Sequence, residues 1–145
     1  MRLPSQVDGQ CVFCGIVGGS QPASIVLDEG EVLAFCDIQP AAPGHLLVVP
    51  REHAEGLADL PDAHGRAMWS MAQRLARAVR RAVRCDGVNL FLADGAAAGQ
   101  EISHVHLHVV PRTVGDGVFR ISANWSLPAR TDLDASAARI RSVLI

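Results

Sequence analysis

The sequence lacks the marks of several classes of protein. Its 145 residues contain no apolar run close to the roughly 20 residues that a helix needs to cross a bilayer. Residues 1–6 are polar and do not include the apolar stretch of a secretory signal. We therefore expect a cytoplasmic protein with no membrane partner.

An excess of charge of either sign is also absent. The chain has 13 Lys and Arg against 15 Asp and Glu, which gives a formal net charge of −2. A protein that binds nucleic acid normally presents a basic face, so we expect no nucleic-acid partner. A single nucleotide is not excluded, because a few backbone N–H groups and histidines can hold one phosphate.

The sequence has no internal repeat and no low-complexity linker. Apolar residues make up 49% of the chain, which is enough to build a core. The length is close to that of the commonest single domains. We therefore predict one domain that comprises residues 1–145.

Apolar patterns and turn residues predict an α+β fold. Because the strand segments follow one another, we expect an antiparallel sheet of about five strands with one long helix and short N- and C-terminal helices. Asp62 is the predicted N-cap of the long helix and Gly87 its stop signal. The predicted strands are 24–27, 32–37, 45–49, 88–93 and 105–110, and the predicted helices are 12–17, 62–84 and 133–144.

Three of the six histidines, His104, His106 and His108, alternate along the last predicted strand. Successive side chains of a strand point to opposite faces, so all three should lie on one side. The apolar residues between them should then face the core. Imidazole titrates near neutral pH, attacks phosphorus and binds metals, and the pattern alone leaves these uses open.

The four cysteines do not form a pattern typical of a disulfide framework. Cys11 and Cys14 form a C-x-x-C pair, whereas Cys36 and Cys85 lie in apolar surroundings that indicate packing. Two thiolates at the C-x-x-C spacing can bind one tetrahedral zinc, which then needs two more nitrogen or sulfur ligands. Redox use and simple burial of the pair remain the alternatives.

A loop of small residues, 95–100, leads into the histidine segment. Small residues let the backbone approach a ligand closely, and consecutive N–H groups can bind an anion. By itself such a run is also compatible with an ordinary loop.

Together these residues resemble the histidine triad family of nucleotide hydrolases and transferases. Residues 104–110 read His-Val-His-Leu-His-Val-Val, which matches the alternation of histidine and apolar residues in that family. Residues 35–40, 43–50 and 99–100 fall where the family has corresponding segments. The resemblance extends from about Cys11 to Arg112.

The resemblance implies a homodimer of α+β subunits, each with a nucleotide on the sheet. His106 would be the nucleophile toward the α-phosphorus, and the nucleotidyl-histidine would pass its nucleotide to water. We expect a backbone carbonyl to fix the other ring nitrogen of His106. His108 and His45 would bind or polarise phosphate oxygens, and Gln100 would lie beside the phosphate and the leaving group.

The family resemblance also implies a binding site for a nucleotide such as AMP or GMP. Asp37 matches the acidic residue that binds the ribose hydroxyls, as suits a carboxylate that only accepts hydrogen bonds. The base pocket would be lined by apolar residues that could equally belong to the core, namely Phe13, Ile16, Phe35 and Ile38. The phosphate would lie along the segment Gly99, Gln100, Glu101 and Ile102.

The zinc-containing bacterial members of the family carry a similar C-x-x-C pair. Their ligands correspond here to Cys11, Cys14, His53 and His104, which implies one structural zinc per chain. Only His106 and His108 of the triad would then serve catalysis.

Two positions depart from the family pattern, so the sequence does not decide which leaving group the protein prefers. Ala93 stands where many relatives have Asn or Gln, a contact that Asp94 could replace, and Glu101 stands where others have Ser or Thr. The primary prediction is a hydrolase acting on a phosphoramidate, an acyl-nucleotide or a dinucleoside polyphosphate. The alternatives are a phosphorylase, a nucleotide-binding regulatory module and a zinc-stabilised interaction protein.

Overall fold

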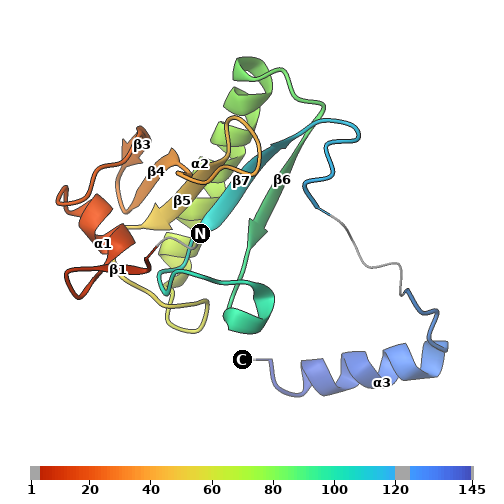
Figure 1. Ribbon diagram of the computed structural model, residues 1–145. Helices are drawn as coiled ribbons and strands as arrows, with labels where there is room; N and C mark the ends of the chain where they lie inside the picture. The colour runs from red at the N-terminus through yellow and green to blue at the C-terminus, as the bar shows by residue number, and fades with distance from the viewer. Residues whose placement is uncertain (1–3, 120–124, 145) are drawn as a thin grey trace.

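The computed structural model describes residues 4–119 and 125–144. Its centre is an antiparallel sheet of five strands in the order β3-β4-β5-β7-β6 (Figure 1). A two-stranded hairpin precedes this sheet. These elements confirm the predicted α+β class with its five-stranded sheet. The strands are β1 (Gln6–Val7), β2 (Gln10–Cys11), β3 (Ile25–Glu29), β4 (Val32–Cys36), β5 (Leu46–Pro50), β6 (Gly87–Leu92) and β7 (Leu107–Arg112).

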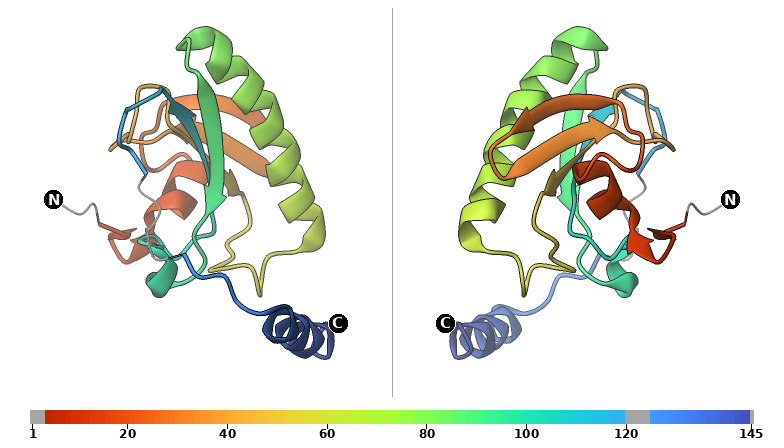
Figure 2. Two further views of the ribbon diagram at one scale, coloured as in Figure 1. Left: turned by 90° about the vertical axis from the view of Figure 1, so that its right-hand side faces the viewer. Right: turned by 90° about the vertical axis from the view of Figure 1, so that its left-hand side faces the viewer.

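Two helices lie on opposite sides of the sheet (Figure 2). The long helix α2 (Asp62–Ala82) covers one face, and the short helix α1 (Val12–Val17) lies on the other. A single 3₁₀ turn, η1 (Ala96–Ala98), precedes the histidine segment. Within 4–119 and 125–144, no helix combines the length and the apolar character needed to cross a membrane.

The alternation of side chains along the strands divides the core into two clusters. The first lies between the sheet and α2 and contains Val32, Ala34, Leu46, Val48, Leu107 and Val109 of the strands with Met68, Met71, Ala72, Leu75 and Val79 of the helix. The second lies on the α1 side and contains Phe13, Leu33, Phe35, Leu47 and Val49. The histidine side chains share this second face, because His108 is paired with Leu47 across the ladder between β5 and β7.

The histidine strand begins later than predicted. β7 starts at Leu107, so His106, which the predicted strand 105–110 included, precedes it, as does His104. The reason is that the Val105 N–H donates to the carbonyl of Ala54, in the loop after β5, and not to a strand. The alternation of faces nevertheless holds, since Val105 is fully buried between the two histidines.

The end of α2 also differs from the prediction. Gly87 does not stop the helix but is the first residue of β6, paired with Arg112. The chain turns earlier, at Arg84, which takes a left-handed φ of 50°. The turn has to be complete before Asp86, because the N–H of Asp86 already donates to the Arg112 carbonyl and so joins the ladder between β6 and β7.

The remaining differences at helix ends amount to one to three residues. Pro61 occupies the N-cap position of α2, and Asp62, the predicted cap, lies in the first turn, where its charge favours the helix dipole. The C-terminal helix α3 (Arg130–Arg141) both starts and ends earlier than the predicted 133–144 and has no buried residue. It stands apart from the sheet in Figure 1.

Because α2 packs tightly on the sheet, removing a buried side chain between them should destabilise the fold. Leu75 is 4% exposed in the first cluster, so Leu75→Ala should lower the free energy of unfolding by about 2–5 kcal/mol. Arg77→Ala, on the exposed face of the same helix, should change it by less than about 0.5 kcal/mol. Urea denaturation of both variants measures the difference, and equal midpoints would contradict the assignment of Leu75 to the core.

Candidate active site and metal site

His106 is buried with its ring oriented by a backbone carbonyl, as the sequence predicted. Its Nδ1 lies 2.8 Å from the carbonyl oxygen of His104. A carbonyl only accepts, so Nδ1 carries the proton and Nε2 keeps the lone pair. Phe13 contacts the ring edge-on with centroids 5.3 Å apart. His106 therefore presents Nε2 as an unprotonated nitrogen.

His45 and His108 form a directed chain of hydrogen bonds. The Ala41 N–H donates to Nδ1 of His45 at 3.0 Å, so Nε2 of His45 carries the proton. This Nε2–H faces Nδ1 of His108 at 2.8 Å and donates to it. Nε2 of His108 must then hold a proton, which makes His108 a hydrogen-bond donor toward the site.

An aromatic residue that the sequence did not suggest holds the His108 ring. Phe91 of β6 stacks on it with centroids 4.1 Å apart and planes inclined by 8°. Phe119 in turn contacts Phe91 edge-on at 5.0 Å. Phe91 is paired with His108 across the ladder between β6 and β7. The partnership depends on strand register, and for that reason no local pattern in the sequence reveals it.

Asp37 lies beside the histidine chain. Its Oδ2 is 3.6 Å from Nε2 of His45, and its Oδ1 accepts a hydrogen bond from the N–H of Gln39. Asp37, His45 and His108 bring three potential metal-binding atoms together. A metal would have to displace the proton that the Ala41 N–H assigns to Nε2 of His45, so we interpret this group as a hydrogen-bonded network.

Burial keeps the active-site histidines neutral. Desolvation lowers the pKa of His106 below its ordinary value of 6.5. Desolvation, followed by the nearby His106 and His45, lowers the pKa of His108 to about 3. At pH 7 both rings are therefore uncharged, as a nitrogen nucleophile and a neutral N–H donor require.

The four predicted metal ligands come together. Their donor atoms, in Cys11, Cys14, His53 and His104, all lie within 4.8 Å of one another. Nδ1 of His104 is 3.5 Å from each sulfur and 3.2 Å from Nδ1 of His53. These are close to the separations expected between ligands of one tetrahedral ion.

The hydrogen bonds around this cluster also suit a metal. Nε2 of His104 lies 2.8 Å from the carbonyl oxygen of Pro50 and donates to it, so the lone pair of Nδ1 faces the cysteines. Burial, with a contribution from Cys11, raises the pKa of the Cys14 thiol to about 11. A thiolate at this position requires a cation, and the donor set of two sulfurs and two nitrogens fits zinc.

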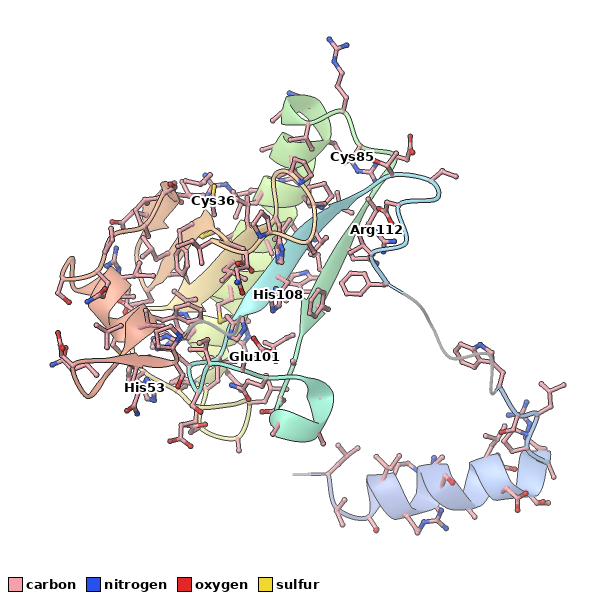
Figure 3. The ribbon with its side chains drawn as sticks, viewed as in Figure 1. Cys36, His53, Cys85, Glu101, His108 and Arg112 are labelled. Carbon is pink, nitrogen blue, oxygen red and sulfur yellow. The ribbon has the colours of Figure 1, made fainter. Side chains whose placement is uncertain are left out.

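The other two cysteines take no part in this cluster. Figure 3 shows Cys36 and Cys85 well separated from His53. Cys36 is exposed at the end of β4, so its predicted role in packing is wrong. Its side chain escapes burial because it is the last residue of the strand, beyond the four that the core covers.

The loop predicted to cradle the phosphate is held together internally. The N–H groups of Gly99 and Gln100 donate to carbonyls of Ala96 and Gly95 within the loop. The Gln100 side chain accepts from the Gly95 N–H and donates to the carbonyls of Glu55 and Ile102. In this conformation the Gln100 side chain links the loop after β6 to the loop after β5 by hydrogen bonds.

The other residues predicted to contact the nucleotide, and the two positions that depart from the family pattern, differ in their burial. Phe13 and Phe35 are buried in the second cluster, and Ile16 and Ile102 pack against it. Ile38 is 78% exposed and follows Asp37 directly in the chain. Glu101 is exposed on the segment before His104 (Figure 3). Ala93 is buried, and Asp94 accepts a hydrogen bond from the Leu57 N–H.

Comparison with known proteins agrees with this geometry. Residues 19–115 match the family model of the HIT domain. The chain belongs to the HIT family. It is 39% identical over 127 residues to an uncharacterised HIT-like protein of Mycobacterium tuberculosis, an alignment that covers 88% of this chain and 86% of that protein. These matches confirm the resemblance to histidine triad proteins.

Two further relatives bear on the chemistry. The chain is 36% identical over 135 residues to adenosine 5'-monophosphoramidase HNT1 of Saccharomyces cerevisiae, with 92% of this chain and 80% of the yeast protein covered. It also superposes on a zinc-bound histidine triad family protein of Mycobacterium smegmatis with a TM-score of 0.72 and 38% identity, covering 92% of this chain and 97% of that one. Cys11 and Cys14 precede the residues matched by the HIT model.

The lowered pKa of His108 predicts an acid-sensitive fold. In the unfolded chain His108 binds a proton near its ordinary pKa of 6.5, but in the folded chain only near about 3. Protonation therefore favours unfolding, and this contribution to stability is complete above pH 6.5 and lost progressively toward pH 3. The urea midpoint should fall more between pH 7 and pH 5 for the wild type than for His108→Gln, both loaded with zinc. Parallel pH profiles would contradict this assignment.

Proposed function

We propose that this HIT protein is a nucleotide hydrolase or transferase that cleaves at the α-phosphorus through a nucleotidyl-histidine on His106. The observation that carries the proposal is the tautomer of His106, whose Nδ1–H is bound by the His104 carbonyl and whose Nε2 is free to attack. A neutral imidazole can displace a leaving group from phosphorus and divide one difficult step into two.

In the first step Nε2 of His106 attacks the α-phosphorus. The bond from phosphorus to the leaving nitrogen breaks, and that nitrogen takes up one proton from solvent and leaves as an amine. The imidazole ring of the intermediate becomes positively charged. The His104 carbonyl stabilises this charge through the existing Nδ1–H bond of 2.8 Å.

In the second step water attacks the same phosphorus, and the bond to Nε2 breaks. A nucleoside monophosphate and one proton leave, and neutral His106 is regenerated. Nε2–H of His108 would donate to a phosphate oxygen in both steps. His45 acts through His108, since its own Nε2–H points to that ring.

The substrate class follows from what these groups can bind. Asp37, beside His45, would accept hydrogen bonds from the ribose hydroxyls, and the exposed Ile38 would contact a purine base. The monophosphoramidase activity named for the yeast relative supports a nucleoside phosphoramidate. Acyl-nucleotides and dinucleoside polyphosphates share the same α-phosphorus, with an anhydride in place of the P–N bond.

Replacing the nucleophile tests the proposal. His106→Ala should reduce kcat on adenosine phosphoramidate by at least about 10³-fold, because it removes the nitrogen proposed to form the covalent intermediate. His64→Ala, which removes a histidine outside the site, should retain activity within about twofold. A coupled assay for released AMP or ammonia measures both variants.

The same assay separates the alternatives. Equal turnover by His106→Ala would contradict the nucleophile. A requirement for inorganic phosphate, with a nucleoside diphosphate as product, would identify a phosphorylase. Binding of AMP or GMP with no turnover of any donor would favour a regulatory module.

We further propose that Cys11, Cys14, His53 and His104 hold one structural zinc per chain. All four ligands come from the protein, so the ion would have no open position for substrate. When bound, zinc would fix the first turn of α1 against the loop after β5 and the segment before β7. It would supply stability and order, not an activated water.

Metal analysis tests this second proposal. Purified protein should contain about one zinc per chain, and Cys11→Ser should lower that content at least tenfold. Cys36→Ser, at an exposed cysteine outside the cluster, should retain the metal. Full zinc content in Cys11→Ser would contradict the assignment.

A homodimer remains a prediction from the family resemblance. β6 forms one end of the five-stranded sheet, and its sequence, Gly-Val-Asn-Leu-Phe-Leu, carries no charge that would oppose a second strand. An edge of this kind suits pairing with a second copy of the chain. A cytoplasmic location also remains a prediction.

A further inference from the structure

His104 belongs to both the metal cluster and the active site. Its side chain faces the sulfurs of Cys11 and Cys14 through Nδ1, at 3.5 Å from each. Its backbone carbonyl oxygen accepts the hydrogen bond from Nδ1 of His106. One residue therefore supplies a metal ligand at one end and the group that orients the nucleophile at the other.

The peptide group between His104 and Val105 is held from both sides. Its carbonyl oxygen accepts from His106, and its N–H donates to the carbonyl of Ala54 at 2.7 Å. Ala54 directly follows His53, the second histidine of the metal cluster. Both histidine ligands thus constrain the plane of the one peptide group that fixes the His106 ring.

The orientation of this peptide group decides which nitrogen of His106 carries the proton, and therefore whether Nε2 can attack. The two neutral tautomers of imidazole are close in energy, so the hydrogen bond made by one nitrogen selects between them. If the carbonyl of His104 turns away, the proton is free to move to Nε2. A ring with Nε2–H cannot attack phosphorus, although it still occupies the same position.

We propose that metal bound by Cys11, Cys14, His53 and His104 sets the tautomer of His106 through the peptide group between His104 and Val105. With four ligands on one ion, the carbonyl stays aimed at Nδ1. When the metal leaves, only hydrogen bonds between neutral groups join the ligands, and the peptide group gains freedom. His104 is thus a positioning residue. The inference rests on the proposed role of His106 as nucleophile.

The effect on catalysis should be selective. The donors expected to bind the nucleotide, His108 with His45 and Ala41 behind it, form a chain that does not include the cluster. Asp37 lies at the same end of the site, beside His45. Loss of metal should therefore lower kcat and leave KM nearly unchanged.

The metal can be reached in the folded protein. A cavity of about 110 Å³ opens beside the cluster and is lined by Ser5, Gln6, Cys11, His53, Glu55 and Ser103. His53 itself is exposed. A chelator can therefore approach the cluster from solvent, and removal and return of the metal form a reversible test.

Nitrogen chemical shifts of His106 provide a readout that does not depend on activity. The full-length protein, labelled with ¹⁵N at histidine, is compared zinc-loaded, after chelation and after zinc is returned, with His106→Asn to assign the signals. We expect a single Nδ1–H tautomer when loaded, a population of the Nε2–H tautomer after chelation, and recovery on reloading. An unchanged His106 tautomer in protein shown to have lost its zinc would overturn the inference.

Kinetics on adenosine phosphoramidate complete the test. We expect kcat to fall about tenfold on loss of zinc, with KM within twofold. His53→Asn removes one exposed ligand and weakens metal binding, so its kcat should follow zinc occupancy in a titration, whereas Cys36→Ser should match the wild type. A kcat independent of occupancy would contradict the inference. If loaded protein shows no turnover, the proposed function fails, while the tautomer comparison still decides this coupling.

Discussion

The hydrogen bond between Nδ1–H of His106 and the carbonyl of His104 is the interaction on which the site depends. It leaves the lone pair on Nε2 and fixes the ring, and a buried neutral imidazole without it would have two usable tautomers. Little chain has to be ordered to form this bond, since the acceptor is two residues away in an extended segment. The Val105 N–H, bonded to the carbonyl of Ala54, and Nε2–H of His104, bonded to the carbonyl of Pro50, hold that short segment in place.

Burial gives the site its chemical character. On the face of the sheet opposite α2, the histidines lie against an apolar cluster, and desolvation lowers the pKa of His106 and His108. Neutral rings can then act as nucleophile and as donor at the same pH. Ala41 and Pro50 supply the backbone N–H and carbonyl that assign the protons of His45 and His104. Backbone groups, more than charges, organise this chemistry.

Much of this was predictable from local patterns. Apolar periodicity predicted the five strands and α2, and the family resemblance carried by the three alternating histidines and the C-x-x-C pair predicted both candidate sites. Two of the errors lay where a distant partner decides a boundary. Val105 bonds to Ala54 and delays β7, and Asp86 bonds to Arg112 and forces the turn at Arg84.

The sequence by itself determined which residues to expect at the two candidate sites, because histidines two residues apart share a face of a strand, cysteines three residues apart can share an ion, and the family resemblance adds His53 and His104 as the remaining metal ligands. Only the tertiary structure decided how those residues are connected. It stacked Phe91 on His108, bound the Gln100 amide to the carbonyl of Glu55, and brought the His104 side chain to Cys11. These contacts join residues far apart in the chain through strand register and loop position, and no local pattern encodes either of them.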